Sequence, residues 1–328
     1  MIQKNNKYIA IAILLLGIIL LIGCAEDDSD NTSSQNDDII KVGVILPFSG
    51  ECGAFGSAEL RAIQLAVNEI NDAGGVLGRE IELVVRDSKT DPLSASLNAM
   101  DLIENEGVIA ILGADNSQVS LEMLDAVSDM NTFIISGSAT SDSLKWLDEG
   151  YYHSIFYRTV PDVIQEANTL AKHLIFERGD SVVRLLCVND CYGNSFINWF
   201  SLRYGNYGGR IEKIVKYTTG EISYSAEIES LFAPVVDTIG MSTETDSIPL
   251  VVLVGYPKSG AQIIRDWRTS GYDARWILTS NLKTKEFITM AGAQNTEGIR
   301  GIAPYSGATS EQYIRYEYFK DAYKDMWN

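Results

Sequence analysis

Apolar residues between positions 39 and 144 fall into short runs separated by longer segments of helical periodicity. Runs rich in β-branched residues predict buried strands, and apolar residues spaced three and four apart predict amphipathic helices. The predicted strands cover residues 40–46, 81–85, 108–112 and 132–135, and the predicted helices cover residues 57–73, 92–105 and 119–130. Strands and helices that alternate in this way favour a parallel sheet with helices on both faces.

The same alternation starts again after Pro161. The second part predicts helices at 164–177, 194–204, 225–238 and 259–270, and strands at 181–188, 210–217, 250–254 and 276–279. We therefore predict an α/β fold with two doubly wound parallel-sheet lobes. Ligands of open α/β sheets bind beyond the carboxyl ends of the strands, so the loops that follow these strands are the expected place for a site.

The first residues of the chain have a different pattern. Two lysines precede a continuous apolar run over residues 8–22, which is shorter than the ~20 residues that span a bilayer and is typical of a signal peptide. The run ends in LIGC, which resembles the lipobox of bacterial lipoproteins. Residues 1–23 are therefore predicted to be a signal peptide and Cys24 the lipidated residue. An uncleaved anchor helix that ends in a cysteine is the alternative.

Charge narrows the possible partners. The chain has 44 acidic and 26 basic residues, a formal net charge of −18. Residues 24–38 are acidic and almost free of apolar side chains, and they predict a disordered tether. An acidic surface repels nucleic acid, so no nucleic-acid partner is expected. The only two histidines are His153 and His173, which disfavours a histidine-rich centre, and no metal site is predicted.

A glycine-rich loop at residues 47–56 follows the first predicted strand. Its N–H groups, at the start of a helix, are a candidate cradle for an anion. The glycine spacing G-x-x-G-x-x-G differs from the dinucleotide fingerprint G-x-G-x-x-G, so no cofactor is predicted.

Small hydroxyl residues are concentrated at two other predicted strand ends. Loops 113–118 and 136–141 offer hydroxyls and helix-start N–H groups, which suit a carboxylate or another acceptor. Helix capping alone is the alternative for any single residue in them. Tyr192 and Tyr256 follow two strands of the second part, where a tyrosine either stacks on a ligand or plugs the sheet edge. These loops predict a site for a small polar ligand.

These segments, in this order, resemble the leucine/isoleucine/valine-binding protein family, the type I solute-binding components of ABC importers. The resemblance runs from about Ile39 to Tyr323 and rests on the segments IKVGVILPFSG, AVNEINDAGGVLGREIELVVRDSKTDP, ILGADNSQ, SGSATSDSL, VNDCYG and VGY. It implies two lobes joined by three crossing segments, which close on the ligand by a hinge motion. By this resemblance, residues 39–158 with 303–328 form the first lobe and residues 159–302 the second.

The resemblance also implies a set of ligand-binding residues. Ser117, Ser138 and Thr140 match positions that hold the carboxylate and amino groups of the ligand. Tyr192 and Tyr256 match aromatic residues that close over it. Three more residues complete the set. Phe55 matches an aromatic on the first loop, and Asn116 matches a neighbour of the pocket serine. Asn281 follows the last second-lobe strand.

The sequence departs from the family in two places. Amino-acid binders of the family have an acidic residue after the last second-lobe strand, whereas this chain has the neutral pair Ser280-Asn281, of which the Asn carbonyl still accepts a hydrogen bond. Amides, carboxylates and other small polar molecules are therefore candidate ligands beside amino acids. The family also continues several dozen residues beyond the helix predicted at Glu311–Trp327, so we expect a C-terminally truncated product or a fragment.

The predicted function is that of an extracytoplasmic solute-binding lipoprotein of a branched-chain-amino-acid-type ABC importer. Its partners would be a small polar ligand, the permease and ATPase of the importer, and the membrane through Cys24. A ligand-sensing, receptor-like lipoprotein is one alternative. An exported hydrolase is another alternative. The chain lacks a G-x-S-x-G elbow, and neither histidine lies in a strand-end loop beside a plausible nucleophile, so no catalytic residue and no enzyme are predicted.

Three further cysteines remain, namely Cys52, Cys187 and Cys191. Outside the cytoplasm two of them can pair. Cys187 lies on an apolar strand and fits a core position. The pairings Cys187–Cys191 and Cys52–Cys191 stay open at this point.

Overall fold

Two five-stranded parallel sheets organise the chain. A computed structural model describes residues 39–145, 155–235, 248–304 and 310–327. The predicted signal peptide, Cys24 and the tether lie outside these residues, as do His153 and residues 236–247. Within the described residues, no helix is both long enough and apolar enough to cross a membrane.

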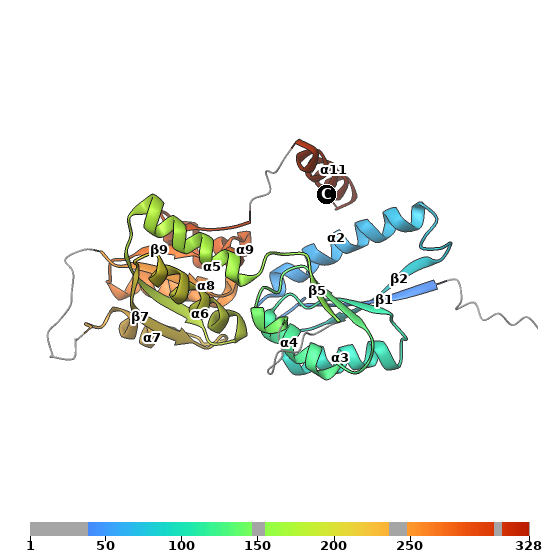
Figure 1. Ribbon diagram of the computed structural model, residues 1–328, viewed down its shortest axis with the longest axis horizontal. Coiled ribbons are helices and arrows are strands. Elements are labelled where there is room, and N and C mark those ends of the chain that lie inside the picture. The colour runs from blue at the N-terminus through green and yellow to red at the C-terminus, as the bar shows by residue number, and fades with distance from the viewer. Residues whose placement is uncertain (1–38, 146–154, 236–247, 305–309, 328) are drawn as a thin grey trace, which may run out of the picture. The chain divides into compact units, whose positions relative to one another are not determined.

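The first sheet has the strand order β2-β1-β3-β4-β5, with every neighbouring pair parallel. Its strands are β1 (Ile39–Leu46), β2 (Glu80–Asp87), β3 (Ala110–Gly113), β4 (Phe133–Ser136) and β5 (Phe156–Arg158). Its helices are α2 (Gly53–Asp72), α3 (Pro92–Glu104) and α4 (Ser117–Ala126). Figure 1 shows α2 on one face of this sheet and α3 and α4 on the other. We call this sheet with its helices the first lobe.

The second sheet has the order β10-β9-β8-β6-β7, again parallel throughout. Its strands are β6 (Val182–Val188), β7 (Arg210–Tyr217), β8 (Leu250–Val254), β9 (Arg275–Leu278) and β10 (Arg300–Gly301). Its helices are α5 (Val163–Lys172), α6 (Cys191–Asn206), α7 (Ser225–Phe232), α8 (Pro257–Ser270), α9 (Lys285–Ala291) and α10 (Ala293–Thr296). This second lobe has a core of its own, and the predicted α/β class with two doubly wound lobes is confirmed.

Parallel strands that are covered on both faces need continuous apolar runs, and β8 has one. All five residues of β8 are buried. The edge strand β2 shows the opposite pattern, because its exposed and half-buried residues alternate at its start. The core of each lobe therefore lies around the central strands.

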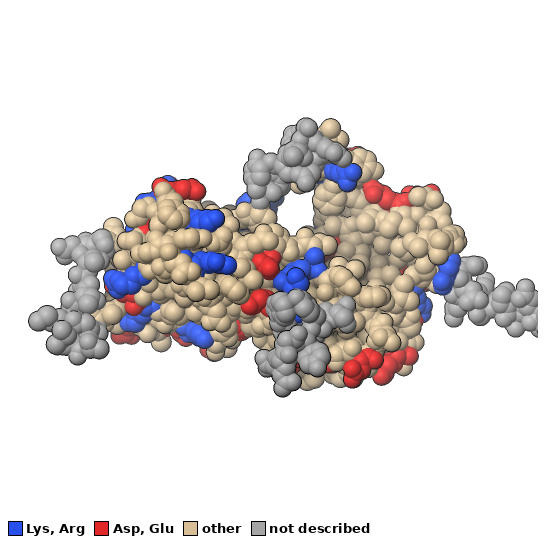
Figure 2. Space-filling view, viewed as in Figure 1, with Lys and Arg blue, Asp and Glu red and all other residues tan. Residues whose placement is uncertain are grey.

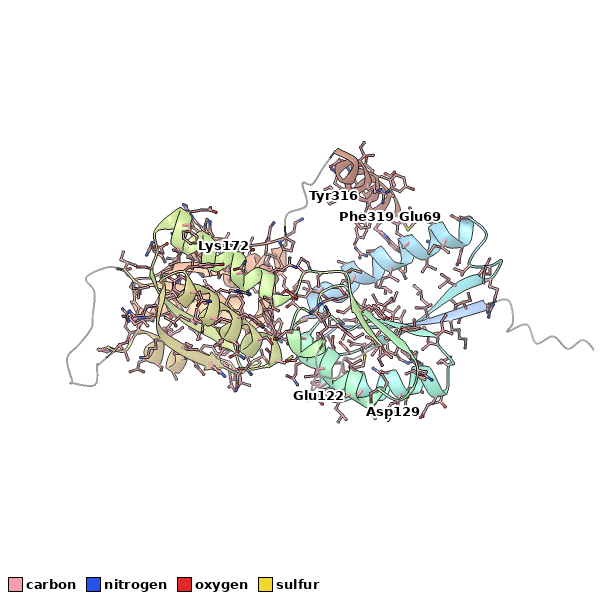
Figure 3. The ribbon with its side chains drawn as sticks, in the orientation of Figure 1. Glu69, Glu122, Asp129, Lys172, Tyr316 and Phe319 are labelled. Atoms are coloured by element: carbon pink, nitrogen blue, oxygen red, sulfur yellow. The ribbon has the colours of Figure 1, made fainter. Side chains whose placement is uncertain are left out.

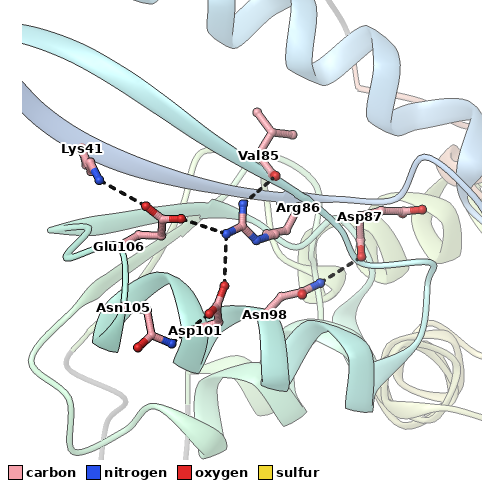
Figure 4. A network of polar contacts seen from close by, with 8 residues as sticks. All are labelled: Lys41, Val85, Arg86, Asp87, Asn98, Asp101, Asn105 and Glu106. Atoms are coloured by element: carbon pink, nitrogen blue, oxygen red, sulfur yellow. Dashed lines mark hydrogen bonds and ion pairs between the residues drawn. The ribbon is translucent and has the colours of Figure 1, made fainter.

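A charged network ties the ends of β1 and β2 to α3, as Figure 4 shows. Arg86 Nη2 on β2 lies 3.1 Å from Asp101 Oδ2 and 3.2 Å from Glu106 Oε1. Glu106 also pairs with Lys41 Nζ at 3.1 Å. Such half-exposed pairs fix local geometry more than they stabilise the fold.

Helix α11 (Ser310–Trp327) packs against α2 of the first lobe. The Tyr318 hydroxyl donates a hydrogen bond to Glu69 Oε1 at 3.1 Å, and the Arg61 guanidinium lies 5.7 Å from the centre of the Trp327 ring. Figure 3 shows Tyr316 and Phe319 on α11 and Glu69 on α2. This contact is in keeping with the assignment of residues 303–328 to the first lobe, although the lobe boundaries themselves stay a prediction.

The predicted start of the first helix was wrong. Helix α2 begins at Gly53 rather than at residue 57, so the last four residues of the glycine-rich segment are helical. Gly56 is required there because a Cβ would lie 1.9 Å from the Pro47 carbonyl oxygen. The sequence pattern also gave no prediction of two short strands, β5, which ends at Arg158, and β10, which begins at Arg300. Such short strands leave no periodicity from which to predict them.

Candidate functional site

A cavity of about 450 Å³ lies at the carboxyl ends of β4, β9 and β10. Its walls come from both lobes. The first lobe contributes Phe55 of α2 with Ser138 and Thr140 of the loop after β4. The second lobe contributes Glu166 of α5 and the pair Ser280-Asn281, which follows β9. This is the edge of each sheet at which open α/β folds bind ligands.

Four of the eight predicted ligand residues line this cavity, namely Phe55, Ser138, Thr140 and Asn281. The other four do not line it. All four are buried, and two of them, Ser117 and Tyr192, form hydrogen bonds with residues that line the cavity. Their role as direct ligand contacts stays a prediction.

Ser117 and Asn116 position the two hydroxyl-rich loops. Ser117 Oγ accepts hydrogen bonds from the backbone N–H groups of Thr140 and Ser141, both at 3.1 Å. Asn116 is the N-cap of α4, and its side-chain oxygen accepts from Val119 N at 3.0 Å. Asn116 therefore acts as a helix cap, which was the alternative for residues of these loops. Ser117 instead links the end of β3 to the loop after β4.

Tyr192 and Tyr256 form a buried aromatic pair behind the cavity. Their ring centres lie 6.0 Å apart, and the two side chains are 1% and 4% exposed. The Tyr192 hydroxyl donates to Glu166 Oε2 at 3.2 Å, and the Tyr256 hydroxyl donates to Asp190 Oδ2 at 2.7 Å. Burial raises the pKa of both phenols well above the ordinary value, so both hydroxyls keep their protons and act as donors.

Glu166 is an acidic residue of the cavity that the sequence did not predict. Its Oε1 accepts from the Ser280 backbone N–H at 2.8 Å while its Oε2 is held by Tyr192. Burial raises the pKa of Glu166, and the bonds from Ser280 and Tyr192 act in the opposite direction. A carboxylate thus lies beside the neutral Ser280-Asn281 pair, supplied by α5 instead of by the loop after β9. Its only sequence signal is an acidic residue in the first turn of a helix, which is common for other reasons.

Two further carboxyl groups, those of Glu59 and Asp115, interact with each other, and Glu59 also lies near Ser138. Burial raises the pKa of Glu59 to about 7, with Ser138 acting in the opposite direction. Burial, and then the charge of Glu59, raise the pKa of Asp115 well above its usual range. Asp115 Oδ1 and Ser138 Oγ are buried, and neither has a hydrogen-bond partner of good geometry among the described residues. Ser138 lines the cavity, and its hydroxyl can both donate and accept, so it is available to a polar group of a ligand.

Direct hydrogen bonds join the two lobes next to the cavity. Ser141 Oγ lies 2.8 Å from Ser195 Oγ, and Trp199 Nε1 donates to Asp142 Oδ2 at 2.7 Å. Ser259 N, at the start of α8, donates to Glu51 Oε1 at 2.6 Å. These contacts place the loops after β1 and β4 against α6 and the start of α8.

The three described cysteines are free thiols, so neither candidate pairing is present. Cys187 is fully buried on β6, as a core residue would be, and Cys52 packs into the core of the second lobe. Burial raises the pKa of Cys191 to about 12, which keeps this thiol protonated and unreactive. Among the described residues, no three histidine, cysteine, aspartate or glutamate side chains come together in a way that could hold a metal ion.

Two doubly wound lobes with this topology form the fold of type I periplasmic binding proteins. Residues 39–328 match the family model described as periplasmic binding protein. The chain therefore belongs to the periplasmic binding protein family.

Individual relatives agree with this assignment. The Leu/Ile/Val-binding protein BraC3 of Rhizobium johnstonii is 24% identical over 249 residues, which cover 76% of this chain and 63% of the relative. The chemotactic signal transduction system substrate-binding protein BasB of Halobacterium salinarum is 25% identical over 248 residues, 74% of this chain and 56% of the relative. This chain thus spans less than two thirds of the length of either relative.

Among solved structures, the branched-chain amino acid transporter substrate binding protein LivJ from Streptococcus pneumoniae, in complex with isoleucine, is similar with a TM-score of 0.73. The match has 22% sequence identity and covers 88% of this chain and 78% of that chain. At this identity the similarity establishes the fold.

Proposed function

We propose that the chain is an extracytoplasmic solute-binding protein that clamps a small polar ligand between its two lobes. The observation that carries the proposal is the cavity at the strand ends, because Ser138 and Thr140 from one lobe and Glu166 and Asn281 from the other line the same space. A ligand in that space contacts both lobes only when they are together. Its differential affinity for that arrangement would drive closure.

The proposed ligand carries a cationic or N–H donor group together with an acceptor group. The donor group is directed at the Glu166 carboxylate, and the acceptor group at the hydroxyls of Ser138 and Thr140 and at the Asn281 amide. Amino acids and amides meet both requirements, whereas a simple carboxylate meets only the second. The relatives named for Leu, Ile and Val binding, and the isoleucine complex of the similar fold, support an amino acid as the first candidate.

We further propose that this protein delivers its ligand to the permease and ATPase of an ABC importer and is anchored to the membrane through lipidated Cys24. The lipobox-like sequence and the acidic segment 24–38 support the anchor and its tether. A sensing role is the second candidate, which the similarity to a chemotactic substrate-binding protein favours. Neighbouring permease and ATPase genes would support transport, and a neighbouring kinase gene would support sensing.

A thermal-shift screen of amino acids, amides and small carboxylates tests the binding proposal. A ligand that binds only the folded protein raises the melting temperature by mass action. For a confirmed amine-bearing ligand we expect Glu166→Gln to weaken the affinity by roughly 10- to 100-fold in calorimetry, because a buried charged hydrogen bond is lost while the side-chain shape is kept.

Glu177→Gln is the matched control, because it is the same substitution at an exposed position beside His173. Its affinity should equal that of the unmodified protein. Equal affinity in both variants would place the ligand away from Glu166, and chemical turnover of the ligand would contradict a binding function.

A further inference from the structure

The second lobe has another cavity, of about 380 Å³, at the opposite edge of its sheet. Leu250, Arg275 and Arg300 line it, and these are the first residues of β8, β9 and β10. The ligand cavity lies beyond the carboxyl ends of β9 and β10, so a strand length separates the two cavities. This second cavity belongs to one lobe alone and has no part in clamping.

Arginine dominates its walls. Arg178, Arg268, Arg275 and Arg300 all line the cavity. Two carboxylates pair with these arginines or line the cavity with them: Asp180, which lies 2.8 Å from both Arg178 Nε and Arg275 Nη1, and Glu297. Four guanidinium groups against two carboxylates leave two positive charges, on a chain whose net charge is −18.

The contrast with the first lobe is plain on the surface. Figure 2 shows acidic side chains gathered at the lower edge of the first lobe, where Figure 3 places Asp129. On the same view several Lys and Arg side chains spread over the second lobe. A local excess of positive charge on an acidic protein attracts anions selectively to that place.

Several donors in the cavity are fixed in place or lack an acceptor. Arg268 Nε and Nη2 donate to the carbonyls of Asn295 and Glu297, and its guanidinium lies 4.3 Å from the centre of the Trp267 ring. The Arg300 guanidinium has no ion-pair or hydrogen-bond partner among the described residues, although the backbone of β10 pairs with β9. Trp276 is only 3% exposed, and its Nε1–H has no acceptor in the described part of the chain.

We propose that this cavity, defined by Arg178, Arg268, Arg275, Arg300 and Trp276, binds a phosphate group. Guanidinium groups suit planar or tetrahedral oxyanions because they donate parallel hydrogen bonds. The dianionic form of phosphate matches the two excess positive charges, and its oxygens supply acceptors for Arg300 and for the Trp276 N–H. Inorganic phosphate and the phosphate of a small phosphorylated molecule share this chemistry.

Calorimetric titration of the full chain with inorganic phosphate tests the proposal. We expect one phosphate per chain, and binding at least 10-fold weaker in Arg300→Ala and several-fold weaker in Trp276→Phe. Arg300 is exposed, so its variant should fold normally. Arg210→Ala is the matched control, because Arg210 begins β7 at the same edge of the sheet but does not line the cavity. It should bind phosphate as the unmodified protein does.

Absence of phosphate binding would overturn the proposal. Equal weakening of phosphate binding in Arg210→Ala and Arg300→Ala would also overturn it, because it would show a diffuse charge effect. Tighter binding of acetate than of phosphate would also overturn it. Glycerol phosphate distinguishes the two sources: binding tighter than that of inorganic phosphate supports a phosphorylated small molecule, and weaker binding supports the free ion. Glu166→Gln should leave phosphate binding unchanged, so this test is independent of the ligand cavity.

Discussion

At the residue scale, the candidate site combines hydroxyls with carboxyl groups. The hydroxyls of Ser138 and Thr140 were predictable because they follow a strand in a loop of small residues. The carboxyl groups of Glu166 and Glu59 were not, since both lie within helices that carry other acidic residues for ordinary reasons. Glu166 meets Ser280 across 114 positions of sequence, and no local pattern reports such a contact.

The raised pKa of Glu59, about 7, makes the stability of the ligand-free protein depend on pH. The folded state holds this proton more tightly than the unfolded state does, so its contribution to stability is complete below the unfolded pKa and is lost as the pH rises through about 7. The free energy of unfolding should therefore be lower at about pH 8 than at about pH 5. Glu59→Gln should reduce this difference by about 1–3 kcal/mol in urea unfolding.

Glu104→Gln is the control for this prediction, because it is the same substitution at an exposed position on α3. It should keep the pH dependence of the unmodified protein. A Glu59→Gln protein whose pH dependence is unchanged would contradict the assignment. Asp115 remains in every variant, and its own raised pKa should preserve part of the dependence.

At the element scale, strands with continuous apolar runs were predicted best. The bounds of β7 and β8 agree with the sequence pattern residue for residue, because turn-forming segments flank both runs. Helix starts were predicted less well. Helix α6 begins at Cys191, three residues before the predicted start, since Asp190 caps it through Gly193 N and draws Tyr192 into its first turn. That shift buries Tyr192, and it explains why an aromatic predicted to face the cleft lies behind the cavity.

The start of α4 offers a test of how the loops are held. Asn116→Ala removes the cap on Val119 N and should lower the free energy of unfolding by about 1 kcal/mol, the usual contribution of such a cap. Asn116→Ser keeps a capping oxygen and should lose less than half as much. Urea unfolding of both variants provides the measurement, and equal stability of Asn116→Ala and the unmodified protein would show that Asn116 does not act as a cap.

At the scale of the whole molecule, the two lobes have separate cores but share a polar boundary. Each core is assembled from the strands and helices of its own sheet, apart from Cys52 and Phe55, which reach from α2 into the second. Few apolar side chains therefore oppose separation of the lobes. The hydrogen bonds between them, worth about 1 kcal/mol each, are small enough for a ligand to tip the balance.

The Trp199–Asp142 hydrogen bond tests this balance without any ligand. Trp199→Phe removes the hydrogen-bond donor at the boundary and keeps most of the apolar ring, so the lobes should separate more often. For a loss of about 1 kcal/mol, the ratio of separated to joined forms should rise about fivefold. Small-angle scattering should then give a larger radius of gyration than the unmodified protein has. Trp267→Phe is the control, because Trp267 Nε1 donates to the Tyr272 carbonyl within the second lobe at 2.8 Å. Its radius should be unchanged, and an equal radius in all three proteins would show that this contact does not hold the lobes together.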